Sequence, residues 1–161
     1  MEHFAPNFPR REFEASQTAV RRDIDNTIPQ ELLPNAIRLS WWLQELRNKI
    51  NRLHRTEGSA RELPIIVTSG YRCPDLNKAI GGSASSQHMK AQAVDFGVPG
   101  MTPRELVDFI VKHHPGFDQM IEEFGRWVHV SVVADNPRGE VLVARKSGGK
   151  TSYSPLKQNS K

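Results

Sequence analysis

Residues 119–133 read QMIEEFGRWVHVSVV, two short segments on either side of Gly125-Arg126, of which the second alternates valines with His129 and Ser131. The alternation and the β-branched valines predict two strands, about Gln119–Phe124 and Trp127–Val133. A two-residue connection is too short for the helical crossover that parallel strands need, so the two strands are expected to pair antiparallel. The stretch therefore favours an α+β fold, with a small, mostly antiparallel sheet packed with helices.

Outside residues 119–133, the sequence predicts three more strands and four helices. The longest helix runs from Pro34 to about His54, where leucine, isoleucine and tryptophan recur every three or four residues. Thr102-Pro103-Arg104-Glu105 opens a second helix with a capping box. The remaining elements are strands at Leu63–Ser69, Ala93–Val98 and Val141–Arg145, a short helix from about Pro74 to Ile80, and a short N-terminal helix capped by Ser16.

Composition limits the class of protein. The chain has 161 residues, and 22 lysines and arginines against 18 aspartates and glutamates give a net charge of +4. This length predicts a single domain, expected over residues 1–145, and the Ser-, Lys- and Gly-rich residues 146–161 predict a flexible tail. The single cysteine excludes an internal disulfide framework and a four-cysteine zinc module.

The sequence shows no targeting or membrane segment. No run approaches the roughly 20 apolar residues that span a bilayer, and the start lacks the basic region and apolar stretch of a signal peptide. The mild positive charge suits an anionic partner, but no basic stretch interleaved with aromatic residues favours nucleic acid. We expect a monomer that is synthesised in the cytoplasm and binds no nucleic acid.

Two of the six histidines have settings that suit metal binding. Asp95 lies in mid-strand on the face opposite its apolar neighbours, and His129 does the same in the strand that begins at Trp127. His88 lies in the loop just before the strand of Asp95. Two imidazoles and one carboxylate leave one coordination position open, which is the arrangement of a catalytic zinc site. The alternative is a buried Asp–His pair that stabilises the fold, with His88 incidental.

An ordered set of short motifs surrounds these residues. They are Ser69-Gly70-Tyr71-Arg72, Leu76-Asn77, Gly81-Gly82, Ser86-Gln87-His88, Ala93-Val94-Asp95-Phe96, Gln119–Phe124 and Trp127–Ser131. In this order the motifs resemble the M15 family of zinc peptidases, in particular its M15A branch of D-alanyl-D-alanine carboxypeptidases and related peptidoglycan endopeptidases, including phage endolysins. The resemblance implies a Hedgehog/D-Ala-D-Ala-peptidase-like fold, with residues 1–145 as the catalytic domain. Ala91 departs from the family's usual glycine, and we expect a modest backbone adjustment there.

Roles for individual residues follow from the resemblance. Arg72 would stabilise the developing oxyanion or hold a substrate carboxylate, which suits a planar and always charged guanidinium. Ser86 would hydrogen-bond the terminal carboxylate of the substrate, and Trp127 would contribute to substrate binding. The zinc ligands that the resemblance implies are His88, Asp95 and His129.

The general base has two adjacent candidates, Glu122 and Glu123. Neighbouring strand residues point to opposite faces, so only one of the two can reach a metal-bound water. The family pattern Gln-(Leu/Met)-Ile-x-Glu selects Glu123. Other members of the wider family place an acidic residue three positions before the last histidine, but that position is Arg126 here, which cannot act as a base.

The resemblance implies zinc-dependent hydrolysis of a peptide bond in the peptidoglycan stem peptide, first of all as a D-alanyl-D-alanine carboxypeptidase. One alternative is an endopeptidase that cuts an internal or cross-link bond as a phage endolysin. A second alternative is a non-catalytic wall-binding or phage structural domain. Since the substrate lies outside the cytoplasmic membrane, a phage enzyme that reaches the bacterial wall during host lysis or from the virion fits the lack of a visible export signal.

Overall fold

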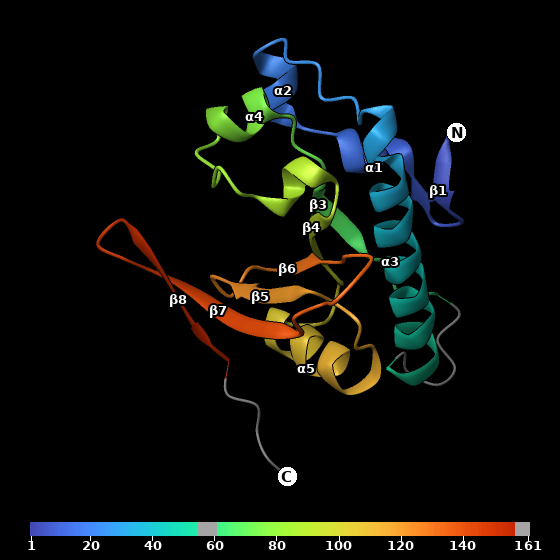
Figure 1. The fold of residues 1–161 in the computed structure, drawn as a ribbon. Helices are drawn as coiled ribbons and strands as arrows, with labels where there is room; N and C mark the ends of the chain where they lie inside the picture. Colours follow the sequence, from blue (N-terminus) through green and yellow to red (C-terminus); the bar gives the residue numbers. More distant parts are fainter. Residues whose placement is uncertain (55–60, 157–161) are drawn as a thin grey trace.

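One mixed sheet organises the fold. A computed structural model describes residues 1–54 and 61–156, and its six-stranded sheet has the strand order β3-β4-β6-β5-β7-β8 (Figure 1). Neighbouring strands pair antiparallel except β5 and β7, which are parallel. The α+β fold and the antiparallel pair within residues 119–133 are therefore confirmed. The strands are β3 (Ile66–Ser69), β4 (Ala93–Gly97), β5 (Gln119–Glu123), β6 (Trp127–Ser131), β7 (Glu140–Ser147) and β8 (Lys150–Pro155).

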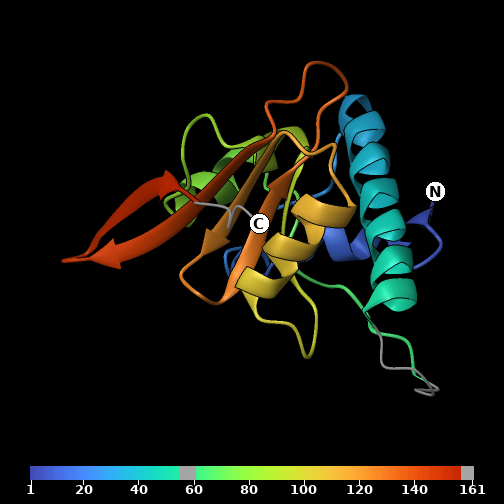
Figure 2. The same cartoon turned by 90° about the horizontal axis from the view of Figure 1, so that it is seen from below.

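Helices lie on both sides of this sheet. In Figure 1, α5 (Pro103–His113) lies below the sheet, and the segment from α4 (Pro74–Ala79) to η2 (Gln87–Lys90) lies above it. The long helix α3 (Leu33–Leu53) runs along one side of the molecule (Figure 2). No described helix combines the length and the apolar character needed to cross a bilayer. The N-terminal elements are β1 (His3–Ala5), β2 (Phe8–Pro9), α1 (Arg10–Glu14), α2 (Gln17–Arg21) and η1 (Gln30–Leu32).

Capping residues set several helix starts, as the sequence predicted. The Ser16 hydroxyl accepts the Ala19 N–H at the start of α2, and Thr102 and Glu105 form the capping box of α5. β1, β2 and α1 were not predicted from the sequence pattern, because each has five residues or fewer and shows no full period. Strand β3 begins at Ile66 rather than Leu63.

The structure corrects the prediction of a flexible tail. Residues 146–155 complete β7 and form β8, which pairs antiparallel with β7 as far as Pro155, while residues 157–161 lie outside the described residues. Gly148 and Gly149 both have positive φ, 55° and 75°, and a Gly-Gly pair of this kind closes a two-residue hairpin. The glycines that suggested a tail are therefore the turn of a hairpin.

The two faces of the sheet differ in polarity. On the face toward α5, alternate strand residues and the inner side of the helix form a fully buried apolar layer, which leaves the other face free for polar groups. The buried layer contains Val94, Phe96, Leu106, Val107, Ile110, Met120, Val128 and Val130.

Gly70 occupies a position where any side chain would meet backbone. A Cβ there would lie 2.5 Å from the Phe13 carbonyl oxygen, which already accepts the Tyr71 N–H over 2.7 Å. Gly70→Ala is therefore expected to lower the free energy of unfolding by about 1–3 kcal/mol in urea denaturation. Gly97→Ala is the matched control, because a Cβ at Gly97 meets nothing within 4 Å. Equal losses in the two variants would contradict this expectation.

His114 is a buried imidazole held in its neutral form. Its Nε2 donates to the Trp42 carbonyl oxygen over 2.9 Å, and its Nδ1 accepts from Lys49 Nζ over 3.1 Å. Burial lowers the pKa of His114 in the folded chain, whereas the unfolded chain has the ordinary value of about 6.5. The unfolded state therefore binds the proton first as the pH falls.

The stability that neutral His114 contributes is thus present above about pH 6.5 and is lost as the pH falls below it, by up to about 1.4 kcal/mol per pH unit. His114→Gln keeps a donor and an acceptor but does not titrate. We expect this variant to show a smaller pH dependence of the unfolding free energy between about pH 5 and 7. An unchanged pH dependence in the variant would refute the assignment.

Candidate metal centre and substrate cleft

Two neighbouring strands place an aspartate and a histidine together on the face away from α5. Asp95 in β4 is the direct cross-strand partner of His129 in β6. His88 joins them from η2, the short helix just before β4. Exposed fractions of 2%, 6% and 9% for His88, Asp95 and His129 show that all three side chains are buried. Sequence positions far apart are thus brought together at one point.

The three donor atoms have the spacing of ligands around one ion. His88 Nε2 lies 3.3 Å from Asp95 Oδ1 and 3.3 Å from His129 Nδ1, and Asp95 Oδ1 lies 2.9 Å from His129 Nδ1. Two ligands at the usual distances from a tetrahedral zinc ion are about 3.3 Å apart. The cluster could therefore hold a metal ion with only small movements of its side chains.

The ring of His88 is oriented by backbone atoms. Its Nδ1 donates to the Gly70 carbonyl oxygen over 2.7 Å, which leaves Nε2 unprotonated and facing the cluster. The Arg72 N–H in turn donates to the His88 carbonyl oxygen over 3.2 Å. Ala91, at the end of η2, takes a left-handed conformation with φ of 51°, which explains a preference for glycine there and costs alanine about 1–2 kcal/mol.

Asp95 is shared between the cluster and Arg72. Its Oδ1 faces the two histidines, while its Oδ2 accepts a hydrogen bond from Arg72 Nη2 over 3.0 Å. Burial alone would raise the pKa of Asp95, but its close contacts with the His129 and His88 imidazoles outweigh burial, and the pKa lies well below its ordinary value. Burial lowers the pKa of His88. Both groups are therefore in the deprotonated form that binds a metal.

The two adjacent glutamates lie on opposite faces. Glu123 lines the cleft above the cluster, and burial together with the nearby Asp95 carboxylate raises the pKa of Glu123. Glu122 is buried on the other face, where its Oε2 lies 2.6 Å from Arg145 Nη1. Of the two candidate bases, only Glu123 therefore has access to the metal cluster.

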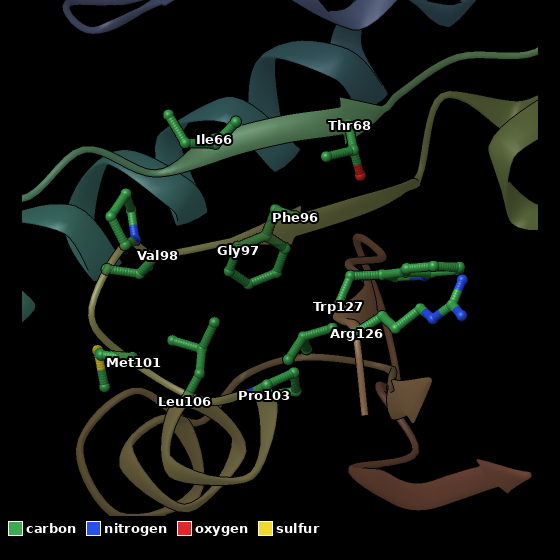
Figure 3. A pocket seen from close by; sticks show the side chains of 12 residues that line it. Ile66, Thr68, Phe96, Gly97, Val98, Met101, Pro103, Leu106, Arg126 and Trp127 are labelled. Carbon is green, nitrogen blue, oxygen red and sulfur yellow. The ribbon is translucent and has the colours of Figure 1, made fainter. Parts of the chain in front are cut away.

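Trp127 contacts the candidate base. Its indole Nε1 donates to Glu123 Oε2 over 2.7 Å and so fixes that carboxylate in place. The Trp127 ring itself lines a separate, mostly apolar pocket of about 250 Å³ between the edge of the sheet and the start of α5, together with Ile66 and Leu106 (Figure 3). Trp127 thus lies beside the cleft that holds the metal cluster, not among the residues that line it.

The cleft has a volume of about 840 Å³ and is open to solvent. On the side of the η2 loop it is polar, and the predicted residues Arg72 and Ser86 both line it. Ser86 Oγ accepts the His88 N–H over 3.3 Å, so its own hydroxyl hydrogen is available to a ligand.

Part of the cleft could not be predicted from the sequence. Arg138 lines it and pairs with Asp118, at 2.7 Å between Nη2 and Oδ2, and hydrogen bonding to Arg138 lowers the pKa of Asp118 to about 2. Asp118 also accepts from Gln87 Nε2, the neighbour of a cluster histidine. Leu142 and Tyr153 line the cleft from the β7–β8 hairpin. No local motif marks these residues, because contacts between segments far apart in the chain bring them to the site.

Comparison with known proteins agrees with this geometry. The family model described as Peptidase M15 matches residues 6–131, a range that contains every residue of the metal cluster. No curated protein matches the chain. The β7–β8 hairpin lies beyond the matched residues.

Proposed function

The chain belongs to the peptidase M15 family, and on that basis we propose that it is a zinc-dependent peptidase of the peptidoglycan stem peptide that acts as a D-alanyl-D-alanine carboxypeptidase. The observation that carries the proposal is the convergence of His88 Nε2, Asp95 Oδ1 and His129 Nδ1 on one point beneath an open cleft, with Glu123 beside them. A purely structural Asp–His pair needs neither the third donor nor the cleft.

Zinc would be held by these three side chains, and when bound it would polarise the scissile carbonyl and lower the pKa of its water to about 7. Glu123 would take a proton from the attacking water and deliver it to the leaving amine. Its raised pKa suits this task, because a carboxylate with a raised pKa is a stronger base toward the attacking water than an ordinary glutamate. Trp127 would hold Glu123 in position through the indole hydrogen bond.

Arg72 would serve the site in two ways. Its Nη2 holds the outer oxygen of Asp95, which leaves the inner oxygen for the metal. Its guanidinium also lines the cleft, where it would stabilise the oxyanion or hold a substrate carboxylate. Ser86, with a free hydroxyl hydrogen, would bind the terminal carboxylate of the substrate.

The open cleft favours one other candidate function. A space of about 840 Å³ is large for a terminal dipeptide and would also admit a chain that continues past the scissile bond. An endopeptidase that cuts within the stem peptide or its cross-link, as a phage endolysin does, is therefore the second candidate. In either case the proposed place of action is the bacterial cell wall.

Mass spectrometry of muropeptides digested by the purified protein distinguishes these functions. We expect release of free D-alanine from stems that end in D-Ala-D-Ala. Split stems without free D-alanine would show that the protein is an endopeptidase and not a carboxypeptidase. Muropeptides left intact by zinc-loaded protein would refute both.

A further inference from the structure

The β7–β8 hairpin forms a wall of the substrate cleft. It extends away from the body of the molecule (Figure 1) and supplies two cleft-lining residues, Leu142 and Tyr153. Because the hairpin lies beyond the matched residues 6–131, family membership assigns no role to it.

The strand register connects this wall to the candidate base. Glu123 in β5 pairs with Ala144 in β7, and Ala144 pairs with Tyr153 in β8. Directly paired residues of neighbouring strands share a face. The three residues therefore form one row on the cleft side, with a small alanine between the carboxylate and the phenol. The Glu123 carboxylate is also close enough to contribute, after burial, to the raised pKa of Tyr153.

Spacing within the sheet sets how far this row reaches from the metal cluster. Three strand-to-strand steps separate β6, which carries His129, from β8. At about 4.8 Å for each step, the backbone of Tyr153 lies roughly 14 Å from that of Trp127, the residue of β6 in the same row and two positions before His129. An extended peptide advances about 3.3 Å per residue, so the same span corresponds to about four residues of a bound peptide.

Tyr153 has the chemistry to bind such a peptide. Tyr153 is 57% exposed, and within the described part of the chain its hydroxyl makes no hydrogen bond. A tyrosine ring offers apolar contact at small cost in side-chain entropy, and its hydroxyl can donate to a peptide carbonyl or a carboxylate.

We propose that Tyr153 is a substrate-binding residue that contacts the stem peptide about four residues from the scissile bond. The inference rests on the proposed function and adds to it that the protein recognises a long stretch of peptide rather than the terminal dipeptide alone. Contact so far from the reacting bond would contribute equally to binding of the ground state and of the transition state, and would therefore act on KM rather than on kcat.

The test compares two substrates, an N-acyl-D-Ala-D-Ala dipeptide and the full stem pentapeptide that ends in D-Ala-D-Ala. Tyr153→Ala in the zinc-loaded protein is expected to raise KM for the pentapeptide about tenfold and to change kinetics on the dipeptide less than about twofold. Ser154→Ala is the matched control, because Ser154 is the next residue in β8 and points to the opposite face. It should leave both substrates unaffected.

Each other outcome overturns the inference. If Tyr153→Ala leaves the pentapeptide KM unchanged, Tyr153 does not bind substrate. Equal losses on both peptides would mean a general effect on the site or on folding. A wild-type protein that cleaves neither peptide would refute the proposed function itself, and the inference with it.

Discussion

Glu123→Gln is expected to reduce kcat by about 10²–10⁴-fold, the usual loss when a positioned general base is removed. The amide keeps the size of the side chain and can still accept the hydrogen bond that Trp127 Nε1 donates over 2.7 Å. It cannot take a proton from water. Zinc content and thermal unfolding should therefore match the wild type, which separates a catalytic defect from a folding defect.

Glu122→Gln is the matched control for this prediction. The residue is adjacent, identical in type and buried, but its carboxylate faces Arg145 on the opposite side of the sheet. We expect its kcat to stay within a few-fold of wild type, because Glu122 is not among the residues that line the cleft of the metal cluster. A large loss in Glu122→Gln with near-normal activity in Glu123→Gln would reverse the assignment.

His88→Ala is expected to abolish tight zinc binding and, with it, activity. Loss of an orienting partner of a metal ligand typically costs 10–100-fold in affinity, and loss of a buried ligand should exceed that. Equilibrium dialysis against zinc measures the effect. His54→Ala, which removes an exposed histidine outside the cluster, serves as the control and should bind zinc as the wild type does.

Zinc should also stabilise the wild-type fold, since an ion that binds only the folded state shifts the unfolding equilibrium. At a free zinc concentration of about 1,000 times Kd, the gain is about 4 kcal/mol, or roughly 8–16 °C in Tm for a chain of this size. His88→Ala should lose most of this increase. A zinc-dependent rise in Tm that survives in His88→Ala would place the metal elsewhere.

Local sequence pattern predicted the parts of the fold and site that depend on alternation and capping. The β5–β6 strands, their antiparallel pairing and the capping box at Thr102 all follow from short-range rules. Alternation also placed Asp95 and His129 on the polar face of their strands. Its place in the loop just before β4 made His88 a candidate third ligand, with an incidental histidine as the alternative, and the resemblance to a known family favoured the ligand.

What the sequence could not show depends on contacts between distant segments. The Gly70 carbonyl orients His88 across 18 positions, and Arg72 holds an oxygen of Asp95. Tyr153 reaches the cleft only because β7 pairs parallel with β5. The residues around Gly148 resembled a tail because a serine-, lysine- and glycine-rich composition suits a hairpin turn equally well.

The central claim is that the His88–Asp95–His129 cluster holds the zinc that drives cleavage of the stem peptide. Its most direct test is a zinc titration of metal-free protein, followed by the rate of D-alanine release from the stem pentapeptide. We expect no release without metal, and a rate that rises with added zinc until about one ion is bound per chain. Full cleavage by the metal-free protein, or saturation with zinc at this cluster without any cleavage, would contradict it.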